Sequence, residues 1–210
     1  MNLVHFDAVA LAIDVGAVVI AFFVGAIPFG VLVSRAFYGT DIRRAGSGNI
    51  GAANALRTLG KRGAIAVLAL DALKGLAPVL AAKAVGGTTP AVLAALAAIV
   101  GHCWSPFLGF KGGKGVATLL GTVIGLWWPA GAAFGLVWIA AVIVCSYASV
   151  GSMLASVAMA PVLWFGIGRI GFAYGLVSAL IIIYRHRENL ERLRRGTENR
   201  LSFLKAPRQS

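Results

Sequence analysis

The sequence is poor in charge, in acidic residues above all, and in cysteine. Only 12% of its 210 residues are charged, and Asp and Glu together number 7. Without a cluster of carboxylates there is no oxygen cage for a hard cation, so we expect no metal site and no cofactor. The two cysteines, Cys103 and Cys145, lie in apolar surroundings without metal-type spacing, which predicts two buried thiols rather than a zinc site or a redox pair.

What is abundant is apolar sequence. Hydrophobic residues make up 59% of the chain and the mean hydropathy is +0.86. Apolar runs of about 18 residues, long enough to cross a bilayer as helices, recur along the whole chain. The start has no basic segment typical of a signal peptide, so we expect a retained span at 15–33. No repeat or composition shift divides the chain, and we predict an all-α integral membrane protein with one multi-pass domain over 1–210.

The net charge is +12, and the basic residues gather at 35–62, 111–114 and 185–208. Clusters beside membrane spans mark the cytosolic side and favour anionic lipids or an anionic substrate, so nucleic acid is not expected as a partner. The N-terminus should then lie outside and the C-terminus in the cytosol. The predicted cytosolic loops lie near 35–62, 111–115, 146–152 and 185–210.

A parity argument gives the number of crossings. The run 63–110 holds two spans with a turn near 85–90, and 116–184 carries a single charge, Arg169. Because 116–184 begins and ends beside basic loops, it crosses an even number of times, and four spans of about 17 residues fit. With 15–33, the sum is about seven transmembrane helices. The remaining turns are expected at Trp127–Pro129, Ser146–Ser152 and Phe165–Arg169.

Two charges fall inside a span. A lone ionised side chain at mid-bilayer costs about 2.5–3.5 kcal/mol on insertion scales. Asp71 and Lys74 are spaced i,i+3 and share a helix face, where they can pair. A proton relay or a substrate contact is one interpretation. We favour a structural ion pair that faces the bundle interior, because a relay should have further partners across the membrane.

The stretch Gly101 to Thr118 combines glycine with positive charge between two apolar runs. Lys111 and Lys114 flank Gly112 and Gly113, and Gly115 follows. Glycine lets successive backbone N–H groups converge on one anion, and a helix N-terminus just after the loop adds to this effect. The loop is not a Walker A motif, because Gly115 stands where Ser or Thr would bind Mg²⁺. It predicts a phosphate site, with a plain cytosolic-side marker as the alternative.

The first basic loop has a similar composition. Its Gly46-x-Gly48-x-x-Gly51 pattern matches the dinucleotide fingerprint only formally, since no strand precedes it. It still offers exposed backbone N–H groups together with neutral donors and an Arg suited to phosphate. Those candidates are Ser47, Gly48, Asn49, Asn54 and Arg57. The alternative is a turn of small residues that caps a helix.

Five further polar residues are candidates. His102 ends an apolar run two turns before Lys111, and is either a core residue or a substrate-orienting group. Ser149 either caps a turn or donates to a substrate oxygen. His186, Asn189 and Glu198 belong to a basic tail that is typical of an amphipathic helix on anionic headgroups. They would then be surface residues, unless the tail folds back over the other loops.

Three segments together resemble the cytosolic motifs of a known family. They are Ser47-Gly-Asn-Ile-Gly-Ala-Ala-Asn-Ala-Leu-Arg57, His102 through Lys111-Gly-Gly-Lys-Gly115, and His186-Arg-Glu-Asn189 through Gly196-Thr-Glu198. In this order and spacing they are similar to the membrane-integral bacterial acyl-phosphate:glycerol-3-phosphate acyltransferases. The resemblance covers nearly the whole chain. One departure is Ala53, where the family usually has Thr.

The resemblance implies transfer of a fatty acyl group from acyl phosphate to the first hydroxyl of glycerol 3-phosphate, giving lysophosphatidic acid and phosphate, at the first step of phospholipid synthesis. It implies a bacterial inner-membrane enzyme with a cytosolic site and a functional link to an enzyme that forms acyl phosphate. His102, Asn189 and Ser47 would be catalytic. The substrate-binding residues would be Gly48, Asn49, Asn54, Arg57, Lys111, Gly112, Gly113, Lys114, Gly115, Ser149, His186 and Glu198.

The main alternative is a transporter of phosphate or a phosphate ester. It would use the same Lys, Arg and Gly residues, but should show binding groups at mid-membrane and two similar halves. Neither is visible in the sequence. A lipid phosphotransferase would need clustered aspartates for metal, and Asp41 and Asp71 are the only Asp residues beyond the N-terminal segment.

Overall fold

Every regular element is helical in the computed structural model, which describes residues 8–201. The helices are α1 (Ala8–Ala26), α2 (Phe29–Tyr38), α3 (Ala52–Thr58), α4 (Gly60–Gly86), α5 (Thr88–Cys103), α6 (Val116–Leu126), α7 (Trp128–Cys145), α8 (Ala148–Arg185) and α9 (Arg187–Arg194), with short 3-10 turns at Ile42–Arg44 and Pro106–Leu108. The all-α prediction is confirmed. The outer ends of the predicted domain 1–210 and loop 185–210 lie outside the described residues.

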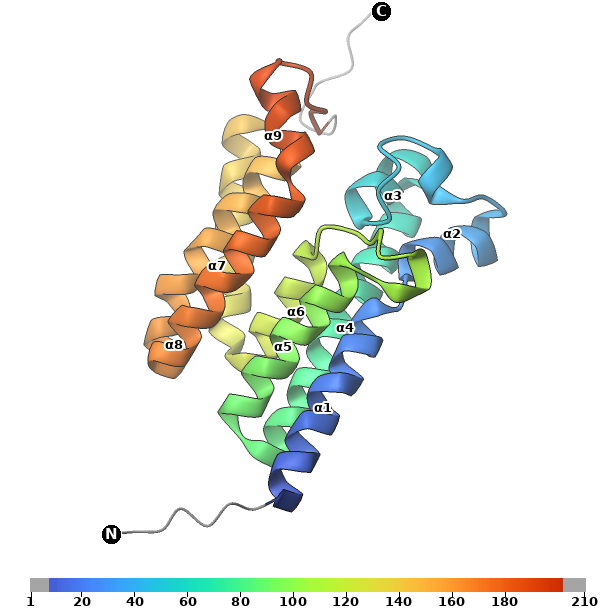
Figure 1. The fold of residues 1–210 in the computed structure, drawn as a ribbon. Coiled ribbons are helices and arrows are strands. Elements are labelled where there is room, and N and C mark those ends of the chain that lie inside the picture. Colours follow the sequence, from blue (N-terminus) through green and yellow to red (C-terminus); the bar gives the residue numbers. More distant parts are fainter. Residues whose placement is uncertain (1–7, 202–210) are drawn as a thin grey trace, which may run out of the picture.

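The long helices form one bundle with two parts (Figure 1). Helices α1, α4, α5 and α6 pack on one another, α7 pairs with α8, and α8 also contacts α5 and α6. The short helices α2, α3 and α9 all lie at the end of the bundle opposite the start of α1. The loops that carry polar motifs are therefore gathered at one end.

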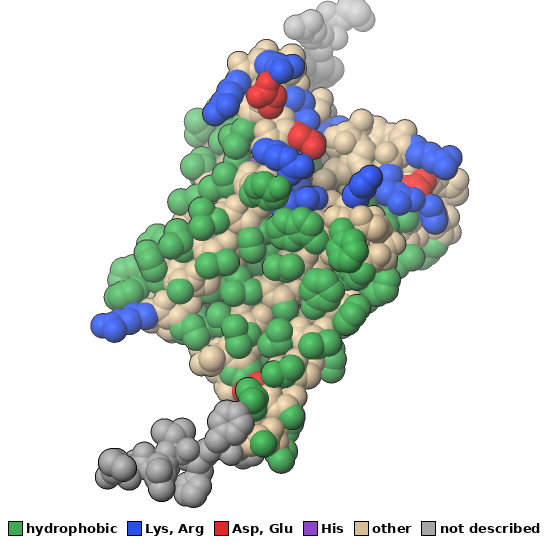
Figure 2. All heavy atoms as spheres, viewed as in Figure 1, with side chains coloured by type: hydrophobic (Ala, Val, Ile, Leu, Met, Phe, Trp, Pro, Cys, Tyr) green, Lys and Arg blue, Asp and Glu red, His purple; other side chains and the backbone are tan. Residues whose placement is uncertain are grey.

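Within residues 8–201, five segments are long and apolar enough to cross a membrane: Ala8–Tyr38, Gly60–Gly86, Thr88–Leu108, Trp128–Cys145 and Ala148–Arg185. Large apolar side chains cover their outer faces, as Figure 2 shows, which suits a hydrocarbon surrounding. The turn predicted near 85–90 lies at Gly87, between α4 and α5. The chain is thus a helical membrane protein.

The first span differs from the expected single crossing at 15–33. Helix α1 already ends at Ala26, and α2 begins as a separate helix at Phe29. The cause is Pro28, which has no N–H to donate and cannot continue the ladder of α1. The expectation that Pro28 would only kink one helix is wrong, and α2 instead leads away from α1 (Figure 1).

The break leaves backbone carbonyls without helical partners inside the bundle, where no water replaces them. Ser105 donates to the Ala26 carbonyl at 2.6 Å, and Lys74 donates to the Ile27 carbonyl at 2.7 Å. Lys74 also pairs with Asp71 at 2.7 Å, and both side chains are almost fully buried. The predicted interior ion pair is present. Its Lys74 also satisfies a backbone carbonyl just after the end of α1.

Of the four spans predicted over 116–184, one departs from a length of about 17 residues. Helix α6 has 11 residues, or about 16 Å, which is shorter than the hydrocarbon core. Helix α8 has 38 residues but is a hairpin, because Ile167 and Gly168 leave the helical region. A Cβ on Gly175 would lie 2.5 Å from the Ala160 Cα, so the two halves of α8 run antiparallel in close contact. The hairpin turn lies within the predicted turn Phe165–Arg169.

Charge is concentrated at the end of the bundle that carries α2, α3 and α9 (Figure 2). The Ser146–Ser152 turn, which has no charge of its own, lies at the same end. The Leu201 N–H donates to the Ser146 carbonyl at 2.9 Å, and Ser149 donates to Glu198 at 2.8 Å. The parity argument therefore placed this turn correctly beside the basic loops.

The contact between α1 and α5 generates a prediction about stability. A Cβ on Gly25 would lie 2.2 Å from the Ala98 carbonyl oxygen, whereas one on Gly16, in the same helix, would meet nothing within 4 Å. We expect Gly25→Leu to lower the unfolding temperature in detergent, because overpacking against backbone costs about 1–3 kcal/mol or more. Gly16→Leu is the matched control and should leave it unchanged. Equal melting of the two variants would contradict this packing.

Candidate functional site

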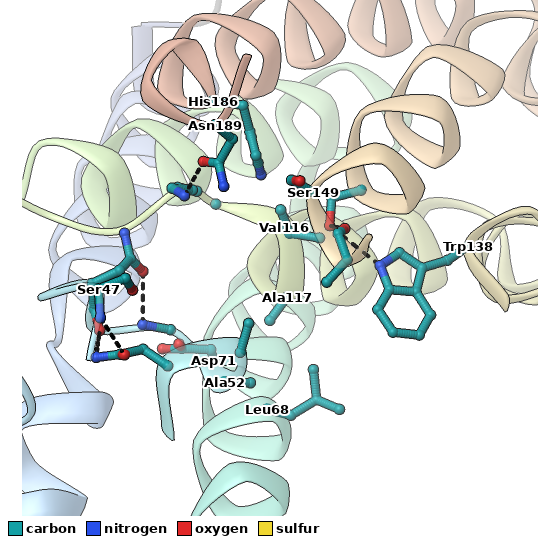
Figure 3. A pocket seen from close by; sticks show the side chains of 18 of the residues that line it. Ser47, Ala52, Leu68, Asp71, Val116, Ala117, Trp138, Ser149, His186 and Asn189 are labelled. Atoms are coloured by element: carbon teal, nitrogen blue, oxygen red, sulfur yellow. Dashed lines mark hydrogen bonds between the residues drawn. The ribbon is translucent and has the colours of Figure 1, made fainter. Parts of the chain in front are cut away.

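A cavity of about 350 Å³ opens among the gathered loops and the helices beneath them. One end is polar and is formed by the first basic loop, the glycine loop 111–115 and the tail after α8. The other end is apolar and lies between α4, α6 and α7. In Figure 3, Ser47 and Trp138 lie at opposite sides of the cavity, with His186 and Asn189 reaching in from the tail.

The first basic loop is shaped by the buried side chain of Asn54. Its amide nitrogen donates to the carbonyls of Ile42, Ala45 and Asn49 at 3.1, 3.1 and 2.8 Å, and its carbonyl oxygen accepts from the Ser47 N–H at 2.9 Å. All its hydrogen-bonding atoms are thus used within the loop. The Ser47 and Asn49 side chains remain at the cavity wall, and Arg57 reaches the same wall from α3.

The glycine loop passes very close to His102. Cβ atoms on Gly112 and Gly113 would lie 2.0 Å from the His102 carbonyl oxygen and 2.2 Å from its Nε2, so neither position has room for a side chain. Arg185 fixes the loop from the end of α8, donating to the Gly112 and Gly113 carbonyls at 2.8 and 3.0 Å. The guanidinium also lies over the Trp104 ring. The loop is therefore rigidly placed at the start of α6.

His102 is held from below by polar groups within the bundle. Its Nδ1 lies 3.1 Å from the Thr118 hydroxyl and 3.8 Å from the Asp71 carboxylate. Its Nε2 faces the Cα of Gly113. Asp71 itself also lines the cavity, as Figure 3 shows. The arrangement makes His102 part of the cavity floor.

The two lysines of the glycine loop diverge. Lys111 is exposed and faces an outer basin of about 630 Å³, whereas Lys114 lies within the wall that separates this basin from the inner cavity. Ser47, Asn49 and Arg192 line both chambers as well. Burial, together with the nearby charge of Arg192, lowers the pKa of Lys114 to about 8. It is therefore charged at neutral pH, between two chambers that can each hold an anion.

The tail folds back over the cavity and binds Lys114 through a chain of polar side chains. Lys114 donates to the Asn189 oxygen, and the Asn189 amide nitrogen donates to Glu198 at 2.6 Å. Glu198 also accepts from Ser149 at 2.8 Å and from Arg192 at 2.8 Å. Burial opposes ionisation of Glu198, but the bonds from Asn189, Arg192 and Ser149 prevail and hold its pKa below the usual value.

His186 begins this tail and is buried against the cavity. Its Nδ1 lies 2.7 Å from the Ile182 carbonyl, which can only accept, so Nδ1 carries the proton. Burial, with the positive charge of Lys114 beside it, lowers the pKa of His186 to about 4. At neutral pH its Nε2 is therefore an unprotonated acceptor in the cavity wall.

The structure brings most of the predicted site residues to the inner cavity. They are Ser47, Asn49, Asn54, Arg57, His102, Lys114, Gly115, Ser149, His186, Asn189 and Glu198. Gly48, Lys111 and Gly112 line the outer basin, and Gly113 packs under His102. Of the two interpretations of the tail, the fold-back holds, since Asn189 and Glu198 are buried.

Sequence reasoning missed three features of the site. Asp71 was interpreted as a structural residue, although it also contacts His102 and the cavity. Arg185 and Arg192 were grouped with lipid-binding basic residues, yet both bind protein groups at the site. The apolar branch carries no motif, and only the helical spacing within α7 could have indicated a shared face.

Comparisons with known proteins point to one family. The family model described as glycerol-3-phosphate acyltransferase matches residues 15–196. A glycerol-3-phosphate acyltransferase of Geobacter sulfurreducens is 50% identical over 166 residues, covering 77% of this chain and 84% of its own. One from Rhodopseudomonas palustris (strain HaA2) is 44% identical over 167 residues, covering 79% and 84%.

Solved structures extend the agreement to the fold. The crystal structure of PlsY, an integral membrane glycerol 3-phosphate acyltransferase, in its glycerol 3-phosphate form has a TM-score of 0.87 at 36% identity, covering 93% of this chain and 99% of that chain. The lysophosphatidic acid form gives 0.83 at 35% identity, covering 90% and 95%. The chain therefore belongs to the PlsY-like glycerol-3-phosphate acyltransferase family.

Proposed function

We propose that this protein transfers a fatty acyl group from an acyl phosphate to the first hydroxyl of glycerol 3-phosphate, releasing lysophosphatidic acid and phosphate. The observation that carries the proposal is the composition of one cavity, which has cationic groups at one end and an apolar branch at the other. A water-soluble phosphate ester and a lipid-borne donor need such a place to meet. The relatives are named for glycerol 3-phosphate as the substrate.

An acyl phosphate is the donor that suits these residues. The inner cavity and the outer basin share Lys114, so two phosphates can lie on either side of its ammonium group. The Ser149 hydroxyl donates to Glu198, whose lowered pKa makes it a weak base, so the structure does not activate Ser149 as a nucleophile. A donor that is already activated requires no covalent enzyme intermediate.

The reaction then needs positioning and charge stabilisation. The acceptor hydroxyl attacks the acyl carbon, the bond from that carbon to the phosphate oxygen breaks, and the hydroxyl proton ends on the departing phosphate. His186 Nε2 accepts a hydrogen bond from the hydroxyl and orients it, while Lys114 offsets the charge that develops on the leaving group. Asn189 fixes the direction of Lys114 through its side-chain oxygen.

The other site residues receive supporting roles. Phosphate oxygens are held by Ser47, Gly48, Asn49 and the loop Lys111–Gly115. Arg57 binds one phosphate through two parallel hydrogen bonds from its planar guanidinium group. The resemblance implied catalytic roles for His102, Asn189 and Ser47. We favour His186 over His102 for the hydroxyl, because the His102 Nδ1 is already paired with the Thr118 hydroxyl and its Nε2 lies close to Gly113 of the glycine loop. His102 then keeps the glycine loop in place.

For the membrane, we propose seven crossings with the N-terminus outside and the site facing the bacterial cytosol. The crossings are α1, α4, α5, α6, α7 and the two halves of α8. The basic residues at the end with the site support this orientation. Helix α6 is too short alone, but the glycine loop before it descends beside α5, where protein rather than lipid surrounds it. A transporter has less support, since the cavity lies at the charged end rather than at mid-membrane.

A direct assay tests the proposed activity. Purified protein in detergent or lipid should release phosphate from palmitoyl phosphate only when glycerol 3-phosphate is present, with lysophosphatidic acid formed in equal amount. Release without the acceptor would indicate a hydrolase. Folded protein that turns over palmitoyl-CoA but not palmitoyl phosphate would refute the proposed donor.

The pKa of Lys114 predicts the alkaline limit of activity. Because Lys114 loses its charge as pH rises through about 8, kcat/KM should fall above that pH, by about tenfold per unit. His186 stays neutral over this whole range. In Lys114→Arg the guanidinium keeps its charge, so the fall should move upward by at least about one pH unit, even if the maximal rate drops. The same alkaline limit in both proteins would remove Lys114 from this role.

A further inference from the structure

The apolar branch of the cavity is a passage between three helices. Leu68 comes from α4, Val116, Ala117 and Leu120 come from α6, and Phe134, Gly135, Trp138 and Ile139 come from α7. The four α7 residues recur at i, i+1, i+4 and i+5, so they share one face over about 7.5 Å of the helix. This face looks toward the beginning of α6, directly beyond the glycine loop.

The two ends of the passage define what can occupy it. At the inner end it meets Lys114 and Gly115, and so joins the polar part of the same cavity. At the outer end, Leu68 and Ile139 are 43% and 53% exposed on the apolar surface of the bundle. An occupant must have a phosphorylated or otherwise polar head near Lys114 and an apolar chain that leads into lipid. A fatty acyl chain fits this description, and the related PlsY has been crystallised in a lysophosphatidic acid form.

Gly135 lies in this passage and has no packing reason to be glycine. A Cβ at Gly135 would meet no atom within 4 Å, whereas one at Gly131, a turn earlier, would lie 2.3 Å from Ile124. Its φ is helical, so no left-handed backbone requires it either. Glycine within a helix costs about 1 kcal/mol relative to Ala. At Gly135 no close contact within the described protein explains this cost. The space that a side chain would fill belongs to the cavity.

The neighbouring walls of the passage are fixed. The Trp138 indole donates to the Ser152 hydroxyl at 3.2 Å, and Ser152 in turn donates to the Ala148 carbonyl at 2.7 Å. Phe134 is buried in the hydrophobic core. The ring of Trp138 therefore cannot swing aside freely, and the free width beside it depends on the side chain at 135.

We propose that Gly135 is a specificity-determining residue for the acyl group, and that its missing side chain is what admits a long fatty acyl chain to the site. The proposal rests on the proposed function, since it concerns the donor of that same reaction. A larger residue at 135 would project into the passage without disturbing the helix. The enzyme would then accept short acyl groups, whose chains end before α7, in preference to long ones.

The test is the ratio of kcat/KM for palmitoyl phosphate to kcat/KM for butyryl phosphate. Gly135→Leu should lower this ratio by at least about tenfold, because a hydrophobic passage discriminates strongly against atoms for which it has no room. Gly135→Ala should give an intermediate ratio. Folding should not fail, since both substitutions raise helix propensity and meet no neighbour. An unchanged ratio, or equal losses with both donors, would overturn the proposal.

The matched control is Gly16→Leu in α1, the same chemical change at another helical glycine whose Cβ would meet nothing within 4 Å. It should leave the ratio as in the unchanged protein.

A binding measurement separates this proposal from the choice of donor. Palmitoyl lysophosphatidic acid should raise the melting temperature of the unchanged protein and of Gly16→Leu but much less that of Gly135→Leu, while glycerol 3-phosphate should stabilise all three. Equal stabilisation by the lysolipid would overturn the role of Gly135 even if no acyl phosphate is turned over.

Discussion

The structure depends on hydrogen bonds to backbone carbonyls that are left where helices end inside the bundle. In lipid such groups find no water, so each needs a donor from the protein. Lys74 and Ser105 donate to carbonyls at the end of α1, and Lys83 donates to the Leu126 carbonyl at the end of α6. Arg185 donates to carbonyls of the glycine loop. Each donor comes from a segment remote in sequence. These bonds allow irregular backbone to exist within a membrane bundle, and one such stretch, the glycine loop, forms part of the site.

The same requirement couples the parts of the site. The glycine loop can stay extended beside α5 only while Arg185 covers its carbonyls, and Arg185 ends the helix that leads into the tail with His186 and Asn189. The loop, the tail and the Ser149 turn therefore assemble together, and Glu198 completes the contact. A site of this kind requires the whole chain, which fits motifs that are spread from the first loop to the last.

How far the sequence predicts this fold depends on the kind of signal. Turns marked by Gly or Pro between apolar runs, and the side on which they lie, follow from hydropathy and charge, as at Gly87 and Ser146. The separate α2 could not be read in the same way, because a Pro in a span is compatible with a kink or a break, and the outcome depends on whether Lys74 and Ser105 reach the freed carbonyls. The shortness of α6 likewise depends on the loop before it being covered by protein. Both features depend on tertiary contacts that the local sequence does not specify.

The site shows a similar limit for charge. The motifs identify which positions gather, but a Lys or Arg in a basic segment looks the same whether it binds substrate, lipid or protein. Here Arg192 is neutralised by the Glu198 carboxylate, and Arg185 uses its donors on the Gly112 and Gly113 carbonyls, whereas Lys114 has one neutral partner, Asn189, that orients it without cancelling its charge. Neutralising a cation within the protein suits structure, and orienting one with an amide suits an anionic ligand. The partner of each cation, which only the three-dimensional structure gives, is what separates Lys114 from the other basic residues around it.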